Sequence, residues 1–427
     1  MQDDNFPHEV RLQYVHSSLG SKRNKPKRGS SNPDIPRRLC NNWFTEYVVC
    51  TSRQCRTCET RKSYRRRHYE IRMNHVELFA GVGGFRRAMD LIAHDLGFPI
   101  ETVAYSEIDN KASVTYNANY DTADELVMGD IVAFVNDQRA MRNLPRYDLL
   151  SGGFPCQTFS MMGSQEGFEE ERGQMFFRIM DMINSRHPRY VLLENVKNLM
   201  KHDGGNTIAV IRAELENAGY IVKMDVFNSN DFGLPQKRNR AIIFARRRHL
   251  GNFEFTADRV REAFAGIDRD RCSLDFYNST IDILDRDVDT KYYLSEKIKP
   301  TILSNGSAGF KSKSEIDQIV ARPLTATMHK MHRACQDNYF SDMYILSNGA
   351  DRPSERMSKE ELARIPIRKL TPKEAFMLQG FPHDFAGRAG AANVADGAMY
   401  KQAGNAVSVN TIYAVLYYLI TNRIMRQ

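Results

Sequence analysis

The stretch HVELFAGVGGFRRAMDLI, residues 75–92, predicts a strand, a glycine turn and a helix in direct succession. The turn contains Gly81, Gly83 and Gly84, and the apolar residues after it recur at helical spacing. Glycines at such a turn let the backbone approach a ligand closely. Because they do not form the G-x-G-x-x-G pattern, we do not expect a dinucleotide as the ligand.

Acidic residues end the predicted strands that follow this turn. The segment ETVAYSE (101–107) ends in Glu107, 26 residues after Gly81, which is near the distance expected for a ribose-binding acid. Asp130, in the segment GDI (129–131), is a further acid at such a position. The glycine turn and the two acids together predict a nucleoside-binding site.

A cysteine lies in the irregular segment GGFPCQTFS, residues 152–160. The apolar run YDLL (147–150) before it predicts a buried strand, which the glycines and Pro155 bring to an end. Cys156 would therefore lie at the carboxyl end of a strand, where open α/β sheets carry their chemistry, and its thiol is a candidate nucleophile. A lone cysteine is more often a packing residue, so the neighbouring motifs decide between the two roles.

Two further predicted strands carry charged residues at one end. RYVLLENV (189–196) predicts a buried strand that ends near Glu194, and a carboxylate there is costly unless it is paired or functional. DFGLPQKRNRAIIF (231–244) predicts another strand, opened by Arg238 and Arg240. Residues two apart point to the same side of a strand, so these arginines form either a shared site or a solvated strand start.

Five short motifs occur in order along residues 75–427: FAGVGGF, GFPCQ, ENV, QKRNR and QAGNAV. Together they resemble the DNA (cytosine-5)-methyltransferases, in particular the bacterial and phage enzymes of the restriction–modification type. The resemblance implies an α/β, Rossmann-like, S-adenosylmethionine-dependent methyltransferase fold, with a mixed, mostly parallel sheet, helices on both faces and a smaller target recognition domain. The divisions it implies are an N-terminal extension (1–72), a catalytic and cofactor-binding domain (73–245), the recognition domain (246–367) and a return to the catalytic domain (368–427).

The resemblance implies that a methyl group moves to C5 of a cytosine flipped out of a specific short sequence in double-stranded DNA. Cys156, as a thiolate, would add to C6 and turn C5 into an enamine-like carbon. Glu194 would contact N3 and the exocyclic amine of the base. Arg240, together with Arg238, would hold Glu194 and the base carbonyl and stabilise negative charge on the ring.

The same resemblance implies S-adenosylmethionine as the cofactor, S-adenosylhomocysteine as the product, and no metal in catalysis. Many relatives carry Trp after the ribose-binding acid, where this chain has Ile108, so apolar contact would replace stacking on the adenine. The implied cofactor-binding residues are Phe79, Gly81, Gly83, Glu107, Ile108, Asp130, Ile131, Pro155 and Asn405.

Residues that would contact DNA come from several parts of the chain. The segment 158–177 resembles the loop of the family that closes over the DNA, where Met161 and Met162 either wedge into the space left by the flipped base or pack against the loop. The recognition region contains Arg, Asn, Gln and His, which suit base reading in the major groove. The implied DNA-binding residues are Gln157, Ser160, Met162, Gln236, Thr325 and Thr327.

The N-terminal extension carries the excess positive charge of the chain, which is +8 overall. Residues 1–72 contain 16 Lys and Arg against 7 Asp and Glu, whereas the rest contains 44 against 45. Three interpretations stay open: a small zinc module, a disordered basic arm or regulatory segment, and a start codon assigned upstream of the true one at Met73. The candidate zinc ligands are Cys40, Cys50, Cys55 and Cys58, of which only the last two form a close pair.

Composition bounds the remaining expectations. No apolar run approaches the roughly 18 residues of a membrane span and no signal peptide is evident, so we expect no membrane partner. A working thiol among seven irregularly spaced cysteines favours a bacterial cytoplasm, with action on the nucleoid. We expect a monomer, with a restriction endonuclease encoded nearby as a second candidate partner. The alternatives are a tRNA cytosine-5 methyltransferase of the same fold and a DNA-binding regulator.

Overall fold

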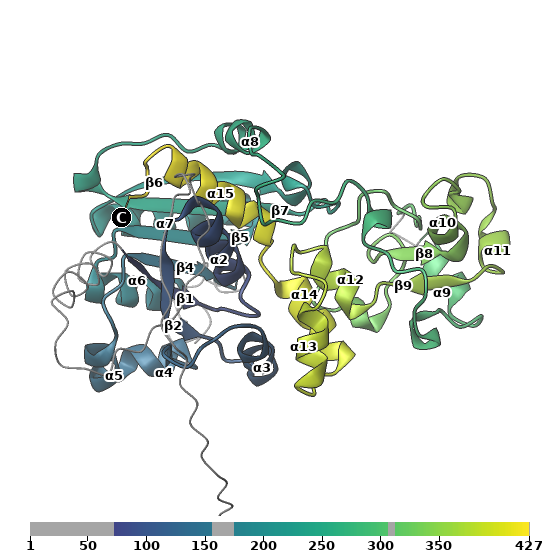
Figure 1. The fold of residues 1–427 in the computed structure, drawn as a ribbon, viewed down its shortest axis with the longest axis horizontal. Helices are drawn as coiled ribbons and strands as arrows, with labels where there is room; N and C mark the ends of the chain where they lie inside the picture. The colour runs from purple at the N-terminus through teal and green to yellow at the C-terminus, as the bar shows by residue number, and fades with distance from the viewer. Residues whose placement is uncertain (1–71, 156–174, 306–311, 427) are drawn as a thin grey trace, which may run out of the picture. The chain divides into compact units, whose positions relative to one another are not determined.

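A seven-stranded sheet organises the chain that the computed structural model describes, which is residues 72–155, 175–305 and 312–426 of the compact unit Glu59–Gln427. The strand order is β3-β2-β1-β4-β5-β7-β6 (Figure 1). Neighbouring strands from β3 to β5 pair in parallel, and β7 pairs antiparallel with β5 and β6, so the predicted mixed, mostly parallel sheet is confirmed. The strands are β1 (Met73–Leu78), β2 (Ile100–Ser106), β3 (Leu126–Val127), β4 (Leu149–Gly153), β5 (Tyr190–Val196), β6 (Tyr220–Asn228) and β7 (Asn239–Arg247).

Helices connect these strands and continue beyond the sheet. The strand predicted at 189–196 corresponds to β5. A short antiparallel pair, β8 (Tyr339–Ser341) with β9 (Ile367–Lys369), lies outside the main sheet. The helices are α2 (Gly84–Leu96), α3 (Asn110–Asn119), α4 (Ile131–Asn136), α5 (Gln138–Asn143), α6 (Met175–Arg186), α7 (Asn206–Asn217), α8 (Ala257–Ala265), α9 (Lys299–Leu303), α10 (Asp342–Leu346), α11 (Lys359–Leu362), α12 (Pro372–Met377), α13 (Phe385–Ala391), α14 (Asp396–Asn405) and α15 (Val409–Thr421).

Helices cover both faces of the sheet, because successive residues of its strands point to opposite sides. In β5, Tyr190 and Leu192 are buried in one hydrophobic cluster with residues of α2, α8 and α15. Val191 and Leu193 are buried in a second cluster with residues of α4, α6 and α7. A strand that is buried on both faces has a continuous apolar sequence, which makes β5 recognisable in the sequence.

The chain returns to the main core at α12, where local and tertiary contacts fix the start of the helix. Thr371 and Glu374 form a capping box, and Pro372 takes the first helical position. The Glu374 carboxylate also accepts hydrogen bonds from both terminal nitrogens of Arg368, at 2.9 and 2.8 Å, in a buried ion pair. Arg368 donates as well to the carbonyl of Asp285, so that two distant segments meet at this helix.

A separate hydrophobic cluster lies in the region predicted to be the recognition domain. It extends from Leu294 to Ile367 in the sequence and includes Tyr339 of β8 and Ile367 of β9. The helix α8, which the prediction places in the same domain, packs instead against α15 in the main core. The domain limits at 246 and 367 therefore stay a prediction.

Among the described residues, one helical stretch, Asp396–Thr421, is long and apolar enough to cross a membrane by composition alone. It combines α14 and α15, and 78% of its most apolar part is buried inside the protein. Its second half, α15, packs against α2 and α8. The apolar surface of α15 is thus accounted for by the main core.

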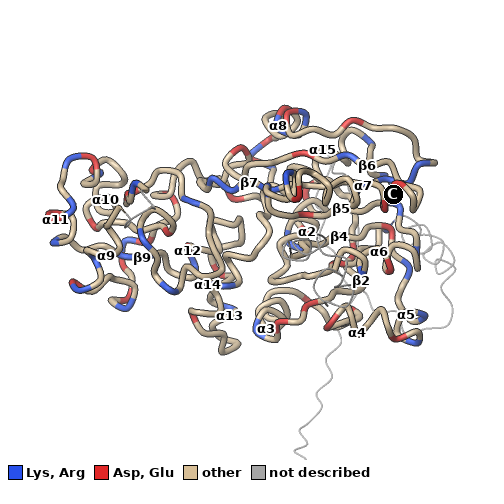
Figure 2. Tube along the Cα trace, turned by 180° about the vertical axis from the view of Figure 1, so that it is seen from behind, with Lys and Arg blue, Asp and Glu red and all other residues tan. Residues whose placement is uncertain are grey.

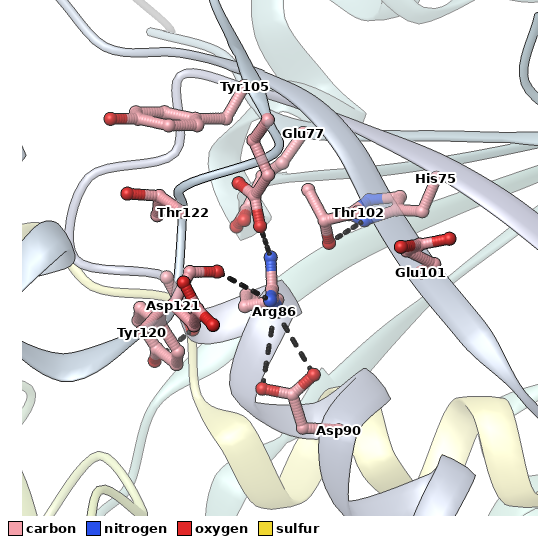
Figure 3. A network of polar contacts seen from close by, with 12 residues as sticks. His75, Glu77, Arg86, Asp90, Glu101, Thr102, Tyr105, Tyr120, Asp121 and Thr122 are labelled. Carbon is pink, nitrogen blue, oxygen red and sulfur yellow. Dashed lines mark hydrogen bonds and ion pairs between the residues drawn. The ribbon is translucent and has the colours of Figure 1, made fainter. Parts of the chain in front are cut away.

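A buried polar network lies beside the turn between β1 and α2 (Figure 3). Glu77 of β1 is fully buried and accepts a hydrogen bond from the Tyr116 hydroxyl at 3.0 Å. Arg86 of α2 forms ion pairs with Glu125 and, at 3.1 Å, with Asp90. Burial is the main cause that raises the pKa of Glu77 to about 8, against the opposing effects of Tyr116 and Arg86. Glu77 is therefore mostly protonated at neutral pH.

Raising the pH should destabilise this fold through Glu77. The native state keeps the proton up to about pH 8, whereas the unfolded chain releases it near the ordinary value of 4.5, so the free energy of unfolding falls as the pH rises between these values. Glu77→Gln removes this titration. When the pH is raised from about 5 to about 8, the melting temperature of the variant should fall less than that of the wild type. Equal losses would show that Glu77 is ionised in the native state.

Candidate active site

A cavity of about 360 Å³ lies at the carboxyl ends of the parallel strands. Open α/β sheets place their ligands at this edge, and the volume is within the range usual for small-molecule sites. The lining comes from the turn after β1 (Phe79, Gly81, Val82), the segment from the end of β2 into α3 (Glu107, Asp109, Ala112), the ends of β4 and β5 (Gly153, Phe154, Pro155, Glu194, Asn195, Val196), the residues around the start of β7 (Arg238, Arg240) and the end of α14 (Lys401, Gln402, Gly404, Asn405, Ala406). The cavity therefore brings together residues from all five sequence motifs.

The glycine turn after β1 is packed tightly against other segments. Gly81 and Gly83 have φ angles of 56° and 82°, in the left-handed region that favours glycine. A Cβ atom on Gly83 would come within 2.4 Å of the Tyr120 ring, and one on Gly84 within 2.6 Å of the Val407 carbonyl oxygen. These glycines let the turn approach α3 and the QAGNAV motif, and this approach closes one side of the cavity.

Glu107 is fixed at the end of β2 by two main-chain hydrogen bonds. Its Oε2 accepts from the amide of Gly81 and its Oε1 from the amide of Asp109, each at 2.7 Å. Burial raises the pKa of Glu107, and these two hydrogen bonds partly offset the rise. Each oxygen keeps a further lone pair that can accept a hydrogen bond from a ligand hydroxyl. The predicted ribose-binding acid thus lines the cavity beside the glycine turn.

Glu194 and Arg240 form an ion pair between β5 and β7. Arg240 Nε lies 2.8 Å from Glu194 Oε1, and the two side chains are only 17% and 10% exposed. Gly153 of β4 is in register with Glu194, and a Cβ atom at Gly153 would lie 3.4 Å from Glu194 Oε2. The ion pair therefore lies beside the end of β4, from which the chain continues to Cys156.

Asn195 connects the ends of β4 and β5, a role that the sequence did not reveal. Its Nδ2 donates to the Phe154 carbonyl at 2.8 Å, and its Oδ1 accepts from the Val196 amide at 2.8 Å. The side chain is buried. The ENV motif thus supplies both a carboxylate to the cavity and an amide that holds the backbone just before the predicted nucleophile.

Arg238 has different partners from those predicted. The guanidinium is buried and donates to three main-chain carbonyls, those of Leu324 (3.1 Å), Gly404 (3.1 Å) and Ala406 (2.8 Å). Burial, with Arg240 nearby, lowers the pKa of Arg238 to about 9. Arg238 precedes the first residue of β7, so the alternation that places residues two apart on one side does not hold there. Among the described residues Arg238 forms no ion pair with Glu194, but it lines the same cavity, and its contact with the base stays a prediction.

Gln236 is also an internal link rather than a surface group. Its Nε2 donates to the Leu378 carbonyl at 2.8 Å, and its Oε1 accepts from the Leu324 amide at 3.0 Å. Both polar ends of this buried side chain form hydrogen bonds within the protein, so the predicted contact of Gln236 with DNA is wrong. Thr325 and Thr327, by contrast, are exposed, and their contact with DNA stays a prediction.

The predicted adenine contacts do not line the cavity. Ile108 is 72% exposed, and Ile131 is buried in the cluster with α6 and α7. Asp130 is exposed and caps α4 by accepting a hydrogen bond from the Val132 amide at 2.9 Å. Cofactor contacts by these three residues stay predictions, whereas Pro155 and Asn405 are among the lining residues.

Lys401 and Gln402 are cavity residues that were not assigned from the sequence. Lys401 Nζ lies 2.7 Å from Asp109 Oδ2 and so joins α14 to the start of α3. Gln402 Oε1 accepts from the Thr115 hydroxyl at 3.0 Å, while its buried Nε2 has no partner in the described chain. This nitrogen is a candidate donor to a ligand. The signal of Gln402 in the sequence is its place in KQAGN, three residues before Asn405.

Several predicted residues lie outside the described residues. Cys156 is one, with Gln157, Ser160, Met161 and Met162. The candidate zinc ligands Cys40, Cys50, Cys55 and Cys58 are also outside. Within the part of the chain that the structure describes, no group of three or more His, Cys, Asp or Glu side chains is arranged to hold a metal ion.

Comparison with known proteins identifies the class to which this site belongs. Residues 73–421 match the family model of the C-5 cytosine-specific DNA methylases. The chain is 33% identical over 340 residues to the type II methyltransferase M.NlaX of Neisseria lactamica, which covers 80% of this chain and 94% of that protein. It is 27% identical over 440 residues to the orphan methyltransferase M.SPRI of Bacillus phage SPR, which covers 82% of this chain and 98% of that protein.

A solved structure shows the same fold. The Dnmt2 methyltransferase of S. pombe superposes with a TM-score of 0.63 at 20% identity, and the match covers 83% of this chain and 100% of that one. The family match and the residues that line the site define a methyltransferase. The chain belongs to the C-5 cytosine-specific DNA methylases, so it methylates C5 of cytosine in DNA, and the predicted family is confirmed.

Arg238→Met should destabilise the protein, whereas Arg240→Met should mainly impair methyl transfer. Loss of the Arg238 guanidinium leaves three buried carbonyls without a donor, so the free energy of unfolding should fall by about 3 kcal/mol, or about 1 kcal/mol for each hydrogen bond. Arg240 has no comparable set of distant carbonyls to hold. Chemical denaturation and methyl incorporation into DNA, measured on both variants, check this. A stable but inactive Arg238→Met variant would contradict the structural role.

Proposed function

We propose that this enzyme methylates cytosine through a covalent bond between Cys156 and C6 of the base. The thiolate would add to C6, which makes C5 nucleophilic. After methyl transfer, loss of the C5 proton and release of Cys156 would restore the aromatic ring. The observation that carries the proposal is the Glu194–Arg240 ion pair beside the end of β4, the strand that leads to Cys156.

The ion pair is chemically suited to hold a cytosine during this addition. A carboxylate can accept from the exocyclic amine, and in its protonated form it can donate to N3. The positive charge of Arg240, in a largely buried place, would stabilise negative charge on the ring more strongly than in water. Asn195 would keep the start of the nucleophile segment in position through its hydrogen bond to Phe154.

We further propose S-adenosylmethionine as the methyl donor, which supplies an electrophilic methyl group when it is bound. The cavity supports this assignment by its volume and its polar groups. Glu107 would accept from the ribose hydroxyls, and the buried Gln402 Nε2 offers a donor that has no partner in the described chain. Phe79 and Asn405 would contact the cofactor from the turn after β1 and from the end of α14.

The proposed substrate is a specific short sequence in double-stranded DNA, with its target cytosine flipped out of the helix. Type II methyltransferases and a phage orphan methyltransferase are both among the relatives. We therefore propose a bacterial or phage enzyme that acts as a monomer on the nucleoid, either as the partner of a restriction endonuclease or alone. The family match supports DNA rather than tRNA as the substrate, and an enzyme rather than a regulator.

Expression in a host that lacks cytosine methylation tests the reaction directly. Bisulfite sequencing of the host DNA should find unconverted cytosines at one recurring short sequence with the wild type. With Cys156→Ala, which removes the nucleophile, all cytosines should convert. Methylation that persists in Cys156→Ala would exclude the covalent mechanism. Full conversion with soluble wild-type protein would exclude DNA as the substrate.

Asn405→Ala should weaken the binding of S-adenosylmethionine without unfolding the protein. The side chain is exposed at the cavity, so its loss removes at most one hydrogen bond to the ligand, or about tenfold in affinity. Isothermal titration calorimetry measures the change. Asn217→Ala, on the exposed surface of α7, is the matched control and should bind as the wild type does. Equal affinity of both variants would remove Asn405 from the cofactor site.

A further inference from the structure

An arginine-rich surface lies at the end of the sheet opposite the cavity. It consists of Arg189 before β5, Arg247 and Arg248 at the end of β7, and Arg423 and Arg426 after α15, and we call these five residues the arginine surface. In Figure 2, several Lys and Arg positions lie near β6, α7 and the chain end marked C. All five side chains are exposed or half-buried.

Hydrogen bonds bring the three segments of the arginine surface together. The Arg247 amide donates to the Arg189 carbonyl at 3.0 Å. The Arg426 amide donates to the hydroxyl of Tyr190, the residue after Arg189, at 3.0 Å. Arg426 Nε donates to the Arg423 carbonyl at 2.9 Å. These three segments, which are distant in the sequence, therefore lie next to one another at this end of the sheet.

The charges of the arginine surface are not neutralised by neighbouring carboxylates. Within the described ranges, none of its five members forms an ion pair, whereas Arg259 and Arg261 of the nearby helix α8 both do. Outside residues 1–72 the chain is nearly neutral, so this surface is a local concentration of charge.

The guanidinium groups are held in place rather than free in solvent. Arg189 lies over the Tyr190 ring and Arg247 over the Tyr220 ring, with Cζ-to-centroid distances of 5.3 and 5.7 Å. Stacking of this kind leaves the N–H donors at the edge of the guanidinium available to a ligand. Arg248 donates to the Glu216 carbonyl at 2.9 Å. Planar guanidinium groups bind phosphate oxygens in pairs, so the arrangement suits a phosphate-rich ligand.

The surface cannot be an extension of the active site. Strand β5 begins at Tyr190, beside the arginine surface, and Glu194 at the cavity follows four residues later, about 13 Å along a strand. The surface lies at the far end of the same strands. Duplex DNA is stiff over about 150 base pairs, so a short segment seated at the cavity does not bend around the domain to reach the opposite edge.

We propose that the arginine surface is a second, sequence-independent site for the phosphate backbone of duplex DNA. It rests on the membership of the chain in a DNA methylase family, and goes beyond the proposed catalytic mechanism, which does not use it. While the active site binds one segment of a DNA molecule, the arginine surface binds another segment of that DNA. This second contact raises the local concentration of DNA at the active site. The exposed large apolar side chains of the described chain all lie outside the arginine surface. An interface with an acidic protein would need apolar side chains at its centre.

The test uses two triple variants with equal loss of charge. Arg248→Gln/Arg423→Gln/Arg426→Gln alters exposed members of the arginine surface. Arg259→Gln/Arg261→Gln/Arg271→Gln is the control, because these exposed arginines face carboxylates. Titration with a fluorescent duplex of about one helical turn, made only of A·T pairs, measures binding without methylation. The wild type and the control should bind two duplexes per chain, and the surface variant one.

Salt dependence gives a second readout of the same proposal. A plot of the logarithm of affinity against the logarithm of salt concentration has a negative slope. Loss of three phosphate contacts should make this slope less steep by roughly two to three. Two duplexes bound by the surface variant would overturn the proposal. So would stronger competition by polyglutamate than by duplex, which would indicate an acidic protein as the partner. The inactive Cys156→Ala enzyme should still bind two duplexes, so failure of the catalytic mechanism is distinguishable from failure of this site.

Discussion

The buried guanidinium of Arg238 holds the site together. It donates to carbonyls in three places, at Leu324 in the predicted recognition region and at Gly404 and Ala406 around the QAGNAV motif. Because β7 begins at the next residue, these bonds fix both regions to the central sheet. Because Arg238 forms no ion pair among the described residues, its buried charge depends on these carbonyl acceptors staying in place. The shape of the cavity between these segments therefore depends on one side chain.

Close approach of backbones is the second constraint on the site. A Cβ atom at Gly84 would overlap the Val407 carbonyl, and one at Gly404 would lie 2.2 Å from the carbonyl carbon of Thr325. Both contacts join segments that are distant in the sequence. Absence of a side chain at these glycines thus brings the first and last motifs to the same cavity, and the polar groups of Glu107 and Glu194 then face a common space.

Much of the fold and part of the site could be predicted, because buried parallel strands are apolar runs that end in functional residues. Glu107 and Glu194 were recognisable as carboxylates at strand ends, and both line the cavity. The partners of Arg238 were not, since an arginine that binds a carboxylate and one that binds three carbonyls look alike in sequence. Lys401 depends on Asp109, which lies far away along the chain. Contacts between distant segments are invisible to local patterns.

The packing of α15 against α2 has a consequence for synthesis of the enzyme in the cell. Helix α2 ends at Leu96 and α15 begins at Val409, so the apolar face of α2 leaves the ribosome long before its partner helix is made. The nascent chain must therefore carry an uncovered apolar face while the intervening residues are synthesised. A prematurely terminated product would expose that face to chaperones and proteases instead of persisting as a partly functional DNA-binding fragment.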